Sequence, residues 1–305
     1  MKRDFLALTD FSPEEIREVL DRAKAIKNDR KKGKDAPQVL KNRTAALIFH
    51  KPSLRTRASF EVGVRELGGS AVYITDKEIS IGKRESVYDV AQVMSRYFGL
   101  ICIRTFAHDT VVELAEHSTV PVVNMLTDLL HPCQVISDLL TIYEHFGKFE
   151  NMKIAYMGDG NNLANSWLKA SGRIKMDLRI GTSPETMPKE ELVHEAQSAG
   201  VSRITITHDP VQAVESADVI YGDVWASMGE KHLEEEKKNL LKDFQINTRL
   251  LSHADPGAIV MHCLPANRGQ EITDEVMDGP QSVIFDQAEN RLHAQKAVLV
   301  KLFEG

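Results

Sequence analysis

Short apolar runs alternate with segments of helical periodicity along nearly the whole chain. Runs of strand length cover two series, the first at 45–49, 71–74, 100–103 and 120–123, and the second at 153–157, 178–180, 204–206, 219–221, 258–261 and 283–285. Between them, apolar residues recur every three or four positions, as at Phe60, Val64 and Leu67. Strands that alternate with helices are typical of parallel sheets covered on both faces. The pattern therefore predicts an α/β protein with two doubly wound parallel-sheet domains.

The predicted helices carry recognisable end signals. Ser12 supplies an N-cap, Pro13 occupies the first helical position and Glu15 completes a capping box, so a helix begins there. The Lys-rich segment 27–34 that follows is interpreted as a solvated loop, because a charge run without aromatic partners is no nucleic-acid site.

The two series of strands meet in segment 131–147, whose later part has helical spacing. We interpret it as an interdomain helix with the boundary near Gln134, which gives domains 1–133 and 134–286. The C-terminal segment 287–305 has the pattern of a long helix, and we expect it to pack back on the first domain. The two domains are thus expected to be joined by helices.

Composition narrows the functional classes. The 305 residues include 38 Lys and Arg against 44 Asp and Glu, a formal net charge of −6, which disfavours a nucleic-acid binder. No segment approaches the length of a membrane span or a signal peptide's apolar region, so we expect a cytosolic protein without membrane partners. The three widely spaced cysteines, at 102, 133 and 263, suit reduced thiols better than disulfides or zinc knuckles.

A basic, hydroxyl-rich cluster follows the first predicted strand and opens the next helix. It contains Ser53, Leu54, Arg55, Thr56 and Arg57. Exposed N–H groups at a helix start, two hydroxyls and a guanidinium suit a phosphate dianion. An N-cap followed by a basic surface turn is the simpler alternative, which Ser53 alone would satisfy, and Arg57 is interpreted as structural.

Further polar clusters follow other predicted strands, where ligands of open α/β sheets collect. Arg104, His131 and Gln134 are donors able to polarise a carbonyl oxygen, although each alone is as consistent with a structural role. Segment 158–163 imitates a dinucleotide fingerprint, but Leu163 holds its third glycine position, which disfavours a nicotinamide cofactor.

Three residues of the second half suit an amino-acid substrate. Asn162, next to Asn161, offers an amide to a carboxylate, although asparagines also simply favour such turns. Asp223 suits an ammonium, and Cys263 suits a position beside a reacting amine, although most free cysteines are small buried hydrophobes.

These clusters, in this order, resemble the aspartate/ornithine carbamoyltransferase superfamily over essentially the whole chain. Segment 53–57 resembles its carbamoyl phosphate signature, and segment 131–134 resembles its carbamoyl-contacting motif. Segments 223–229 and 262–265 are similar to the mobile Ser-Met-Gly loop and the catalytic cysteine segment of the ornithine enzymes, which the aspartate enzymes lack. The resemblance is therefore closest to the ornithine branch.

The resemblance implies transfer of the carbamoyl group of carbamoyl phosphate to the δ-amine of L-ornithine, giving L-citrulline and phosphate, with no metal or redox cofactor. It assigns domain 1–133 to carbamoyl phosphate and domain 134–286 to ornithine. The implied catalytic residues are Cys263, Arg104, His131 and Gln134. The implied carbamoyl phosphate-binding residues are Ser53, Leu54, Arg55, Thr56, Arg104, His131, Gln134, Cys263, Leu264, Arg291 and Ser80. The implied ornithine-binding residues are Asn162, Asp223, Ser227 and Met228, with the segment 227–229 expected to fold over ornithine on domain closure.

One position departs from the ornithine branch. Its members commonly have Gln where Ser80 stands, in a loop that reaches a neighbouring subunit's phosphate site. The resemblance also implies a homotrimer or an assembly of trimers, in which Ser80, Lys83 or Arg84 completes a neighbour's site. Neither the allostery nor the metabolic direction, biosynthetic or degradative, follows from the sequence.

Three alternatives remain open at this stage. A carbamoyltransferase acting on putrescine or an acylated ornithine is the nearest, although Asp223 and Ser227 favour a free α-amino acid. A noncatalytic anion-binding relative and a dehydrogenase are the others. A citrulline assay with a panel of amines, and titration with a nicotinamide cofactor, separate them.

Overall fold

The computed structural model describes residues 2–79, 81–82, 84–226 and 231–304. The chain forms two compact units. Unit 1 comprises Met1–Glu144 and Glu289–Gly305, and unit 2 comprises His145–Ala288. Both are α/β units with parallel sheets, as the alternating pattern predicts.

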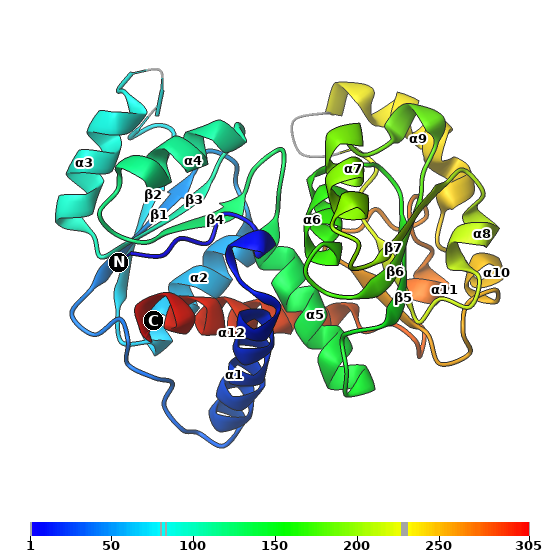
Figure 1. Cartoon of the computed structure of the whole chain (residues 1–305), viewed down its shortest axis with the longest axis horizontal. Coiled ribbons are helices and arrows are strands. Elements are labelled where there is room, and N and C mark those ends of the chain that lie inside the picture. Colours follow the sequence, from blue (N-terminus) through cyan, green and yellow to red (C-terminus); the bar gives the residue numbers. More distant parts are fainter. Residues whose placement is uncertain (1, 80, 83, 227–230, 305) are drawn as a thin grey trace. The chain divides into compact units, whose positions relative to one another are not determined.

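The sheet of unit 1 has four parallel strands in the order β2-β1-β3-β4 (Figure 1). Their bounds are β1 Thr44–Phe49, β2 Ser70–Thr75, β3 Leu100–Arg104 and β4 Val122–Leu126. The inner strands read as continuous apolar runs because both of their faces are buried, whereas the edge strand β2 is half-exposed.

Helices cover both faces of this sheet. Their bounds are η1 Leu8–Asp10, α1 Pro13–Lys31, α2 Leu54–Glu66, α3 Val87–Tyr97, α4 His108–His117, α5 Pro132–Phe146 and α12 Ile284–Glu304. Helices α3 and α4 pack on the face that carries Ala46, Ile48 and Ile101, and α2 and α12 lie on the other side of the sheet (Figure 1). The capping box at the start of α1 forms as expected, since Ser12 and Glu15 each accept the other's backbone N–H.

The sheet of unit 2 has five parallel strands in the order β7-β6-β5-β8-β9. Their bounds are β5 Met152–Met157, β6 Met176–Gly181, β7 Arg203–Thr207, β8 Val219–Gly222 and β9 Ile259–His262. The helices of this unit are α6 Asn162–Ser171, η2 Pro184–Thr186, α7 Glu190–Ser198, α8 Pro210–Val214, η3 Lys231–Leu233, α9 Glu234–Leu241, η4 Lys242–Phe244, α10 Thr248–Leu251 and α11 Asp274–Met277. Helices α6 and α7 lie on one face, and α8, α10 and α11 share an apolar core with the other (Figure 1).

Each sheet has one point at which the chain reverses its direction of winding. In unit 1 this point lies between β1 and β3, and in unit 2 it lies between β5 and β8. The loops that leave two such neighbouring strands run to opposite faces, which opens a crevice at the carboxyl ends of the strands. Residues that follow β1, β3, β5 and β8 are therefore the first places to look for a ligand site.

Two expected strands need correction. The run 120–123 is only partly a strand, because β4 begins at Val122 and continues to Leu126. Segment 283–285 is not a strand: the backbone N–H of Val283 donates to Val260, one isolated bridge forms at Ser282, and α12 begins at Ile284. Three apolar residues are too few to distinguish a short strand from the first turn of a buried helix.

The interpretation of segment 27–34 as a solvated loop is wrong. Helix α1 continues to Lys31, and Lys27 is only 5% exposed. Lys27 lies on the same buried face of α1 as Val19 and Leu20, so its side chain points inward. There its ammonium donates to the carboxylate of Glu144 and to the amide oxygen of Asn290.

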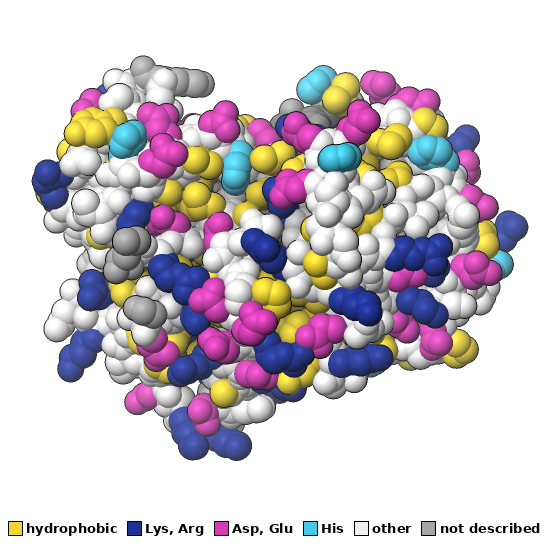
Figure 2. All heavy atoms as spheres, viewed as in Figure 1, with side chains coloured by type: hydrophobic (Ala, Val, Ile, Leu, Met, Phe, Trp, Pro, Cys, Tyr) yellow, Lys and Arg dark blue, Asp and Glu magenta, His cyan; other side chains and the backbone are white. Residues whose placement is uncertain are grey.

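Charges of both signs are interspersed on the face drawn in Figure 2, as the small net charge of −6 leads one to expect. In the part of the chain that the structure describes, no helix is long and apolar enough to cross a membrane. The three cysteines are free thiols, and burial raises the pKa of Cys133 to about 12.

Candidate active site

The loop after β1 forms a helix N-terminus with a network of hydroxyls. Ser53 is the N-cap of α2, and its Oγ accepts the backbone N–H of Thr56 at 3.3 Å. The Ser53 hydroxyl in turn donates to Oγ1 of Thr56 at 3.0 Å. The N–H groups of Leu54 and Arg55, in the first turn of α2, have no acceptor within the helix. This end of α2 therefore presents backbone donors of the kind that bind an oxyanion.

A guanidinium from the other end of the chain joins this loop. Nη2 of Arg291, in α12, donates to Oγ1 of Thr56 at 2.9 Å. Thr56 is fully buried and accepts from both Arg291 and Ser53, so both lone pairs of its oxygen are used and its own proton is left to donate. The sequence motif and the late arginine are thus brought together, although 235 residues separate them.

The two arginines of the motif differ in their surroundings. Arg55 is half-buried and makes no hydrogen bond or ion pair with any residue that the structure describes. Arg57 is exposed, pairs with Glu61 at 2.9 Å and stacks over the ring of Tyr73 at 3.8 Å. Arg57 is thus paired within the helix and stacked on β2, whereas no described residue balances the charge of Arg55.

Arg104, His131 and Gln134 are all buried, at the end of β3 and around the start of α5. Burial lowers the pKa of His131 well below its usual value, and the positive charges of Arg291 and Arg104 lower it further. The imidazole is therefore neutral at pH 7 and keeps one N–H to donate.

The amide of Gln134 makes a hydrogen bond within α5. Its Nε2 donates to Oδ1 of Asp138 at 2.8 Å, one helical turn later, and its buried Oε1 has no hydrogen-bond partner among the described residues. A carboxylate accepts hydrogen bonds and donates none when ionised, so Asp138 fixes this orientation. One N–H of Gln134 is therefore used by Asp138, while its Oε1 is an acceptor and its second N–H is a further donor.

Lys51 is a feature of this region whose role sequence reasoning missed. The residue is 5% exposed, and its ammonium pairs with Asp128 and lies 4.4 Å from the ring centroid of Phe106. These three residues follow β1, β4 and β3, so the Lys51 cation connects the loops that leave three strands of the sheet. The position of Lys51 two residues before the motif was the only signal in the sequence.

In unit 2, the loop after β5 is shaped by two glycines. Gly158 has φ of +137°, which side chains rarely adopt. At Gly160 a Cβ would lie 2.1 Å from the backbone nitrogen of Pro188. The turn delivers Asn161 to the N-cap of α6, where its Oδ1 accepts the N–H of Leu163 at 2.8 Å, and it places Asn162 in the first turn of the helix.

Asp223 gathers the polar groups at the reversal point of this sheet. Its carboxylate accepts Nδ2 of Asn161 at 2.7 Å, the N–H of Val224 at 2.8 Å and the thiol of Cys263 at 2.9 Å. The side chain is 5% exposed, and burial raises its pKa, while the charge of His262 and the donated hydrogen bonds oppose that rise. The predicted pair of Asp223 and Cys263 is therefore in direct contact, with the loop after β5 beside it.

The buried side chain of His262 fixes the backbone that follows Cys263. Nδ1 of His262 accepts the N–H of Leu264 at 3.0 Å, which stabilises the positive φ of 56° at Leu264. Nε2 of His262 faces Oε1 of the buried Glu271 at 3.4 Å, and the His262 backbone N–H donates to Gln287. Sequence reasoning quoted His262 only as part of the motif and missed Glu271, which lies nine residues further on.

Several expected site residues fall outside the described ranges. They are Ser80, Lys83, Ser227 and Met228. The expectations attached to them stay predictions, as does the trimer in which Ser80, Lys83 or Arg84 reaches a neighbouring chain. In the described ranges, no group of three or more His, Cys, Asp and Glu side chains is arranged to hold a metal ion.

The two units match two family models in the same order. Residues 3–144 match the aspartate/ornithine carbamoyltransferase carbamoyl-P binding domain, and residues 150–302 match the aspartate/ornithine carbamoyltransferase Asp/Orn binding domain. Curated relatives named ornithine carbamoyltransferase occur in Methanoculleus marisnigri and Methanosarcina acetivorans. The first is 45% identical over 100% of this chain and 98% of its own length, and the second is 48% identical over 99% of each.

A solved structure gives the same result. The ornithine carbamoyltransferase from Pyrococcus furiosus superposes with a TM-score of 0.94 at 45% identity, over 100% of this chain and 98% of its own. Sequence motifs, both domain models and the fold agree over the full length, and the chain belongs to the aspartate/ornithine carbamoyltransferase family.

Proposed function

We propose that the protein is an ornithine carbamoyltransferase, which converts carbamoyl phosphate and L-ornithine to L-citrulline and phosphate. The observation that carries the choice of ornithine is the contact between the Cys263 thiol and the Asp223 carboxylate in the unit matched by the Asp/Orn binding domain. A thiol and a carboxylate at the reversal point of a sheet suit an amine that must lose a proton. The full-length relatives named ornithine carbamoyltransferase support the same conclusion.

Carbamoyl phosphate is bound in unit 1. The phosphate is held by Ser53, Arg55 and Thr56, together with the backbone N–H of Leu54 at the start of α2. Helix N-termini and guanidinium groups are the usual protein partners of phosphate oxygens. The half-buried Arg55, whose charge no described residue balances, supports this assignment.

The carbamoyl group lies toward Arg104, His131 and Gln134. The N–H of the neutral His131 and the guanidinium of Arg104 donate to the carbonyl oxygen. The positive charge of Arg291 further stabilises the negative charge that develops on this oxygen. The Oε1 of Gln134 accepts one N–H of the carbamoyl amide. Donors placed where negative charge develops lower the barrier to a tetrahedral intermediate, and losing one typically costs a hundredfold or more in turnover.

Ornithine is bound in unit 2. Asn162 and the backbone of Met228 hold its α-carboxylate, and Asp223 and Ser227 hold its α-ammonium. Cys263 and Leu264 are the residues that this unit contributes to the binding of carbamoyl phosphate. These assignments follow the family motif residue by residue, and the clustering of Asp223, Asn161 and Cys263 supports them.

The reaction needs the neutral δ-amine. An alkyl amine has a pKa near 10.4, so the site must favour its unprotonated form. We assign this task to Cys263, whose thiol donates to Asp223: it helps to select or deprotonate the δ-amine, while Asp223 holds the α-ammonium. The nitrogen of the neutral amine then forms a bond to the carbamoyl carbon. The carbon–oxygen bond to phosphate breaks with its electron pair on the leaving phosphate, which takes up the proton that the nitrogen loses.

The test is citrulline formation by the purified protein, with carbamoyl phosphate and either L-ornithine, putrescine or N-acetylornithine. We expect L-ornithine to be the preferred amine by at least a hundredfold in kcat/KM, a margin typical of sites that pair a substrate's charged group. Cys263→Ala should lower kcat and shift its pH profile, while Cys133→Ala, which removes a buried thiol bonded to the Asn124 carbonyl, should keep that profile. Carbamoyl phosphate binding without turnover of any amine would refute the proposal.

A further inference from the structure

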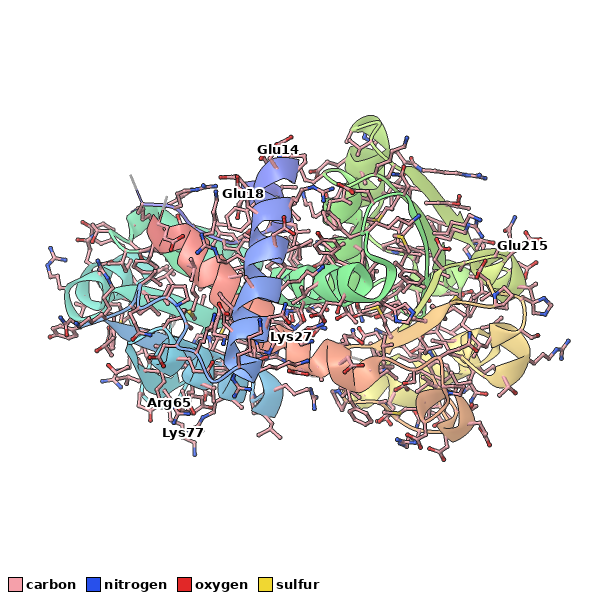
Figure 3. All side chains as sticks on the ribbon, turned by 90° about the horizontal axis from the view of Figure 1, so that it is seen from below. Glu14, Glu18, Lys27, Arg65, Lys77 and Glu215 are labelled. Atoms are coloured by element: carbon pink, nitrogen blue, oxygen red, sulfur yellow. The ribbon has the colours of Figure 1, made fainter. Side chains whose placement is uncertain are left out.

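A buried ammonium joins the two helices that continue from one compact unit into the other. Nζ of Lys27, in α1, donates to Oε2 of Glu144 in α5 at 2.8 Å and to Oδ1 of Asn290 in α12 at 2.7 Å. Lys27 is 5% exposed and Asn290 is fully buried. Figure 3 labels Lys27 on α1, where this helix passes over α12. Helices α5 and α12 cross the boundary of unit 1 at Glu144 and Glu289. Lys27 therefore binds both helices next to this boundary.

Asn290 completes the connection between α5 and α12. Its Nδ2 donates to Oγ1 of Thr141 at 3.0 Å and to Oε2 of Glu144 at 2.8 Å, while its Oδ1 accepts from Lys27. Both ends of the amide are therefore used, and the orientation of the amide is fixed. We call Lys27, Thr141, Glu144 and Asn290 the three-helix lock.

The lock lies on the same helices as the carbamoyl phosphate residues. Arg291, whose guanidinium donates to Thr56, directly follows Asn290. On α5, Gln134 and Thr141 are seven residues apart, which places them about two turns apart on one face. A rotation or slip of α12 against α5 would break the lock and would also move Arg291 relative to Gln134 and Thr56.

Stability alone gives a weak reason for this arrangement. Replacing a buried ion pair by apolar side chains of similar volume is often neutral or stabilising, because the pair must be desolvated. A buried network with several specific hydrogen bonds favours one register of the helices over its neighbours. We therefore expect the main effect of the lock to be the position of the side chains on α5 and α12, such as Arg291.

We propose that Lys27 is a positioning residue for carbamoyl phosphate: through Glu144 and Asn290 it sets the register of α12 on α5 and so places Arg291 against Thr56. The inference rests on the proposed function, because its readout is the handling of carbamoyl phosphate. Lys27 itself touches neither substrate.

The test uses the double variant Lys27→Met/Glu144→Met, which removes both charges of the 2.8 Å pair; Glu289, whose carboxylate lies 3.9 Å from Nζ of Lys27, is exposed to solvent. Lys24→Met is the matched control, since Lys24 lies one turn earlier on α1 and contacts α5 through the ring of Tyr143, at 3.8 Å, without a bond to α12. We expect the double variant to unfold at a slightly lower urea concentration, because the buried Oδ1 of Asn290 loses its donor. It should keep its KM for ornithine and raise the KM for carbamoyl phosphate about tenfold, as when a hydrogen bond to a charged group is weakened. The control should match the wild type in all three.

A double-mutant cycle with Arg291→Ala identifies the route. If the lock acts through Arg291, the Lys27→Met/Glu144→Met changes should raise the KM for carbamoyl phosphate by less than twofold in the Arg291→Ala background. A full tenfold effect there, or no effect in the wild-type background, overturns the proposal. Should the double variant not fold, Thr141→Val, which removes one hydroxyl from the lock, decides: a two- to threefold rise in the same KM supports the proposal and an unchanged KM rejects it. A wild-type protein that makes no citrulline refutes the proposed function instead.

Discussion

Thr56→Val tests the hydroxyl at the centre of the carbamoyl phosphate residues. Valine has nearly the same shape, so the change removes one oxygen and one proton donor from a side chain that is fully buried. Arg291 loses the acceptor that it reaches at 2.9 Å, and Ser53 loses the acceptor that it reaches at 3.0 Å. A hydrogen bond to a charged group contributes roughly 1.5–3 kcal/mol, and the Thr56 proton no longer reaches the ligand.

The expected loss of transition-state stabilisation is therefore about 2–3 kcal/mol, or roughly 30- to 150-fold in kcat/KM for carbamoyl phosphate. The assay is citrulline formation at saturating ornithine and varied carbamoyl phosphate, with urea unfolding measured in parallel. Thr56→Ser is the matched control, because it keeps the oxygen and removes only the methyl group, and it should retain activity within about fivefold. If Thr56→Val and Thr56→Ser had equal kcat/KM values, the hydroxyl would have no part in binding and the network around α2 would be structural only.

Two further predictions concern the loop after β5 and helix α12. Gly160→Ala should destabilise the protein by more than about 3 kcal/mol, since its Cβ would lie 2.1 Å from a backbone nitrogen, whereas Gly172→Ala, whose Cβ would have no neighbour closer than 3.6 Å, should unfold at nearly the wild-type urea concentration. Equal midpoints would show that the loop can move away. Burial lowers the pKa of His293 to about 4, from an unfolded value near 6.5, so the unfolded state binds this proton first and stability is lost as the pH falls from about 6.5 to about 4. Protonation of His293 is expected to cost about 2–3 kcal/mol in the free energy of unfolding. In His293→Gln the urea midpoint should therefore fall less between pH 6.5 and pH 4 than in the wild type; an equal fall in both proteins would contradict this.

The strands were predictable because of where parallel sheets place them. Strands buried on both faces need apolar side chains at every position, so runs such as 100–103 are visible without any knowledge of partners. The same rule fails at 283–285, where one backbone hydrogen bond to Val260 replaces a ladder and a buried helix begins instead. Local pattern identifies an apolar environment more securely than it identifies the element that fills it.

The site motifs were predictable because each stands directly after a strand. Parallel strands bring their carboxyl ends to one edge, so Asp223 and Cys263 meet although 40 residues separate them. The direction of the Gln134 amide was not predictable, because it depends on which neighbour accepts its N–H groups. From the sequence, an N–H of Gln134 is as well suited to donate to Asp138 as to a ligand carbonyl. The structure shows that one N–H donates to Asp138.

The least predictable residues are buried charges whose partners are remote. Lys27 stands among other charged residues and has no signal of burial beyond one position of a helical stripe, while its partners lie 117 and 263 residues away. Periodicity compares neighbours within a few turns, so it registers which face is inward but not what an inward ammonium meets there. A lysine on the apolar face of a helix is therefore ambiguous in sequence: it either extends its ammonium to solvent or pairs inside. The hydrogen bonds of Lys27 to Glu144 in α5 and to Asn290 in α12 show that its ammonium is paired inside the protein. Replacing Lys27 therefore tests the register of these helices rather than the effect of a surface charge.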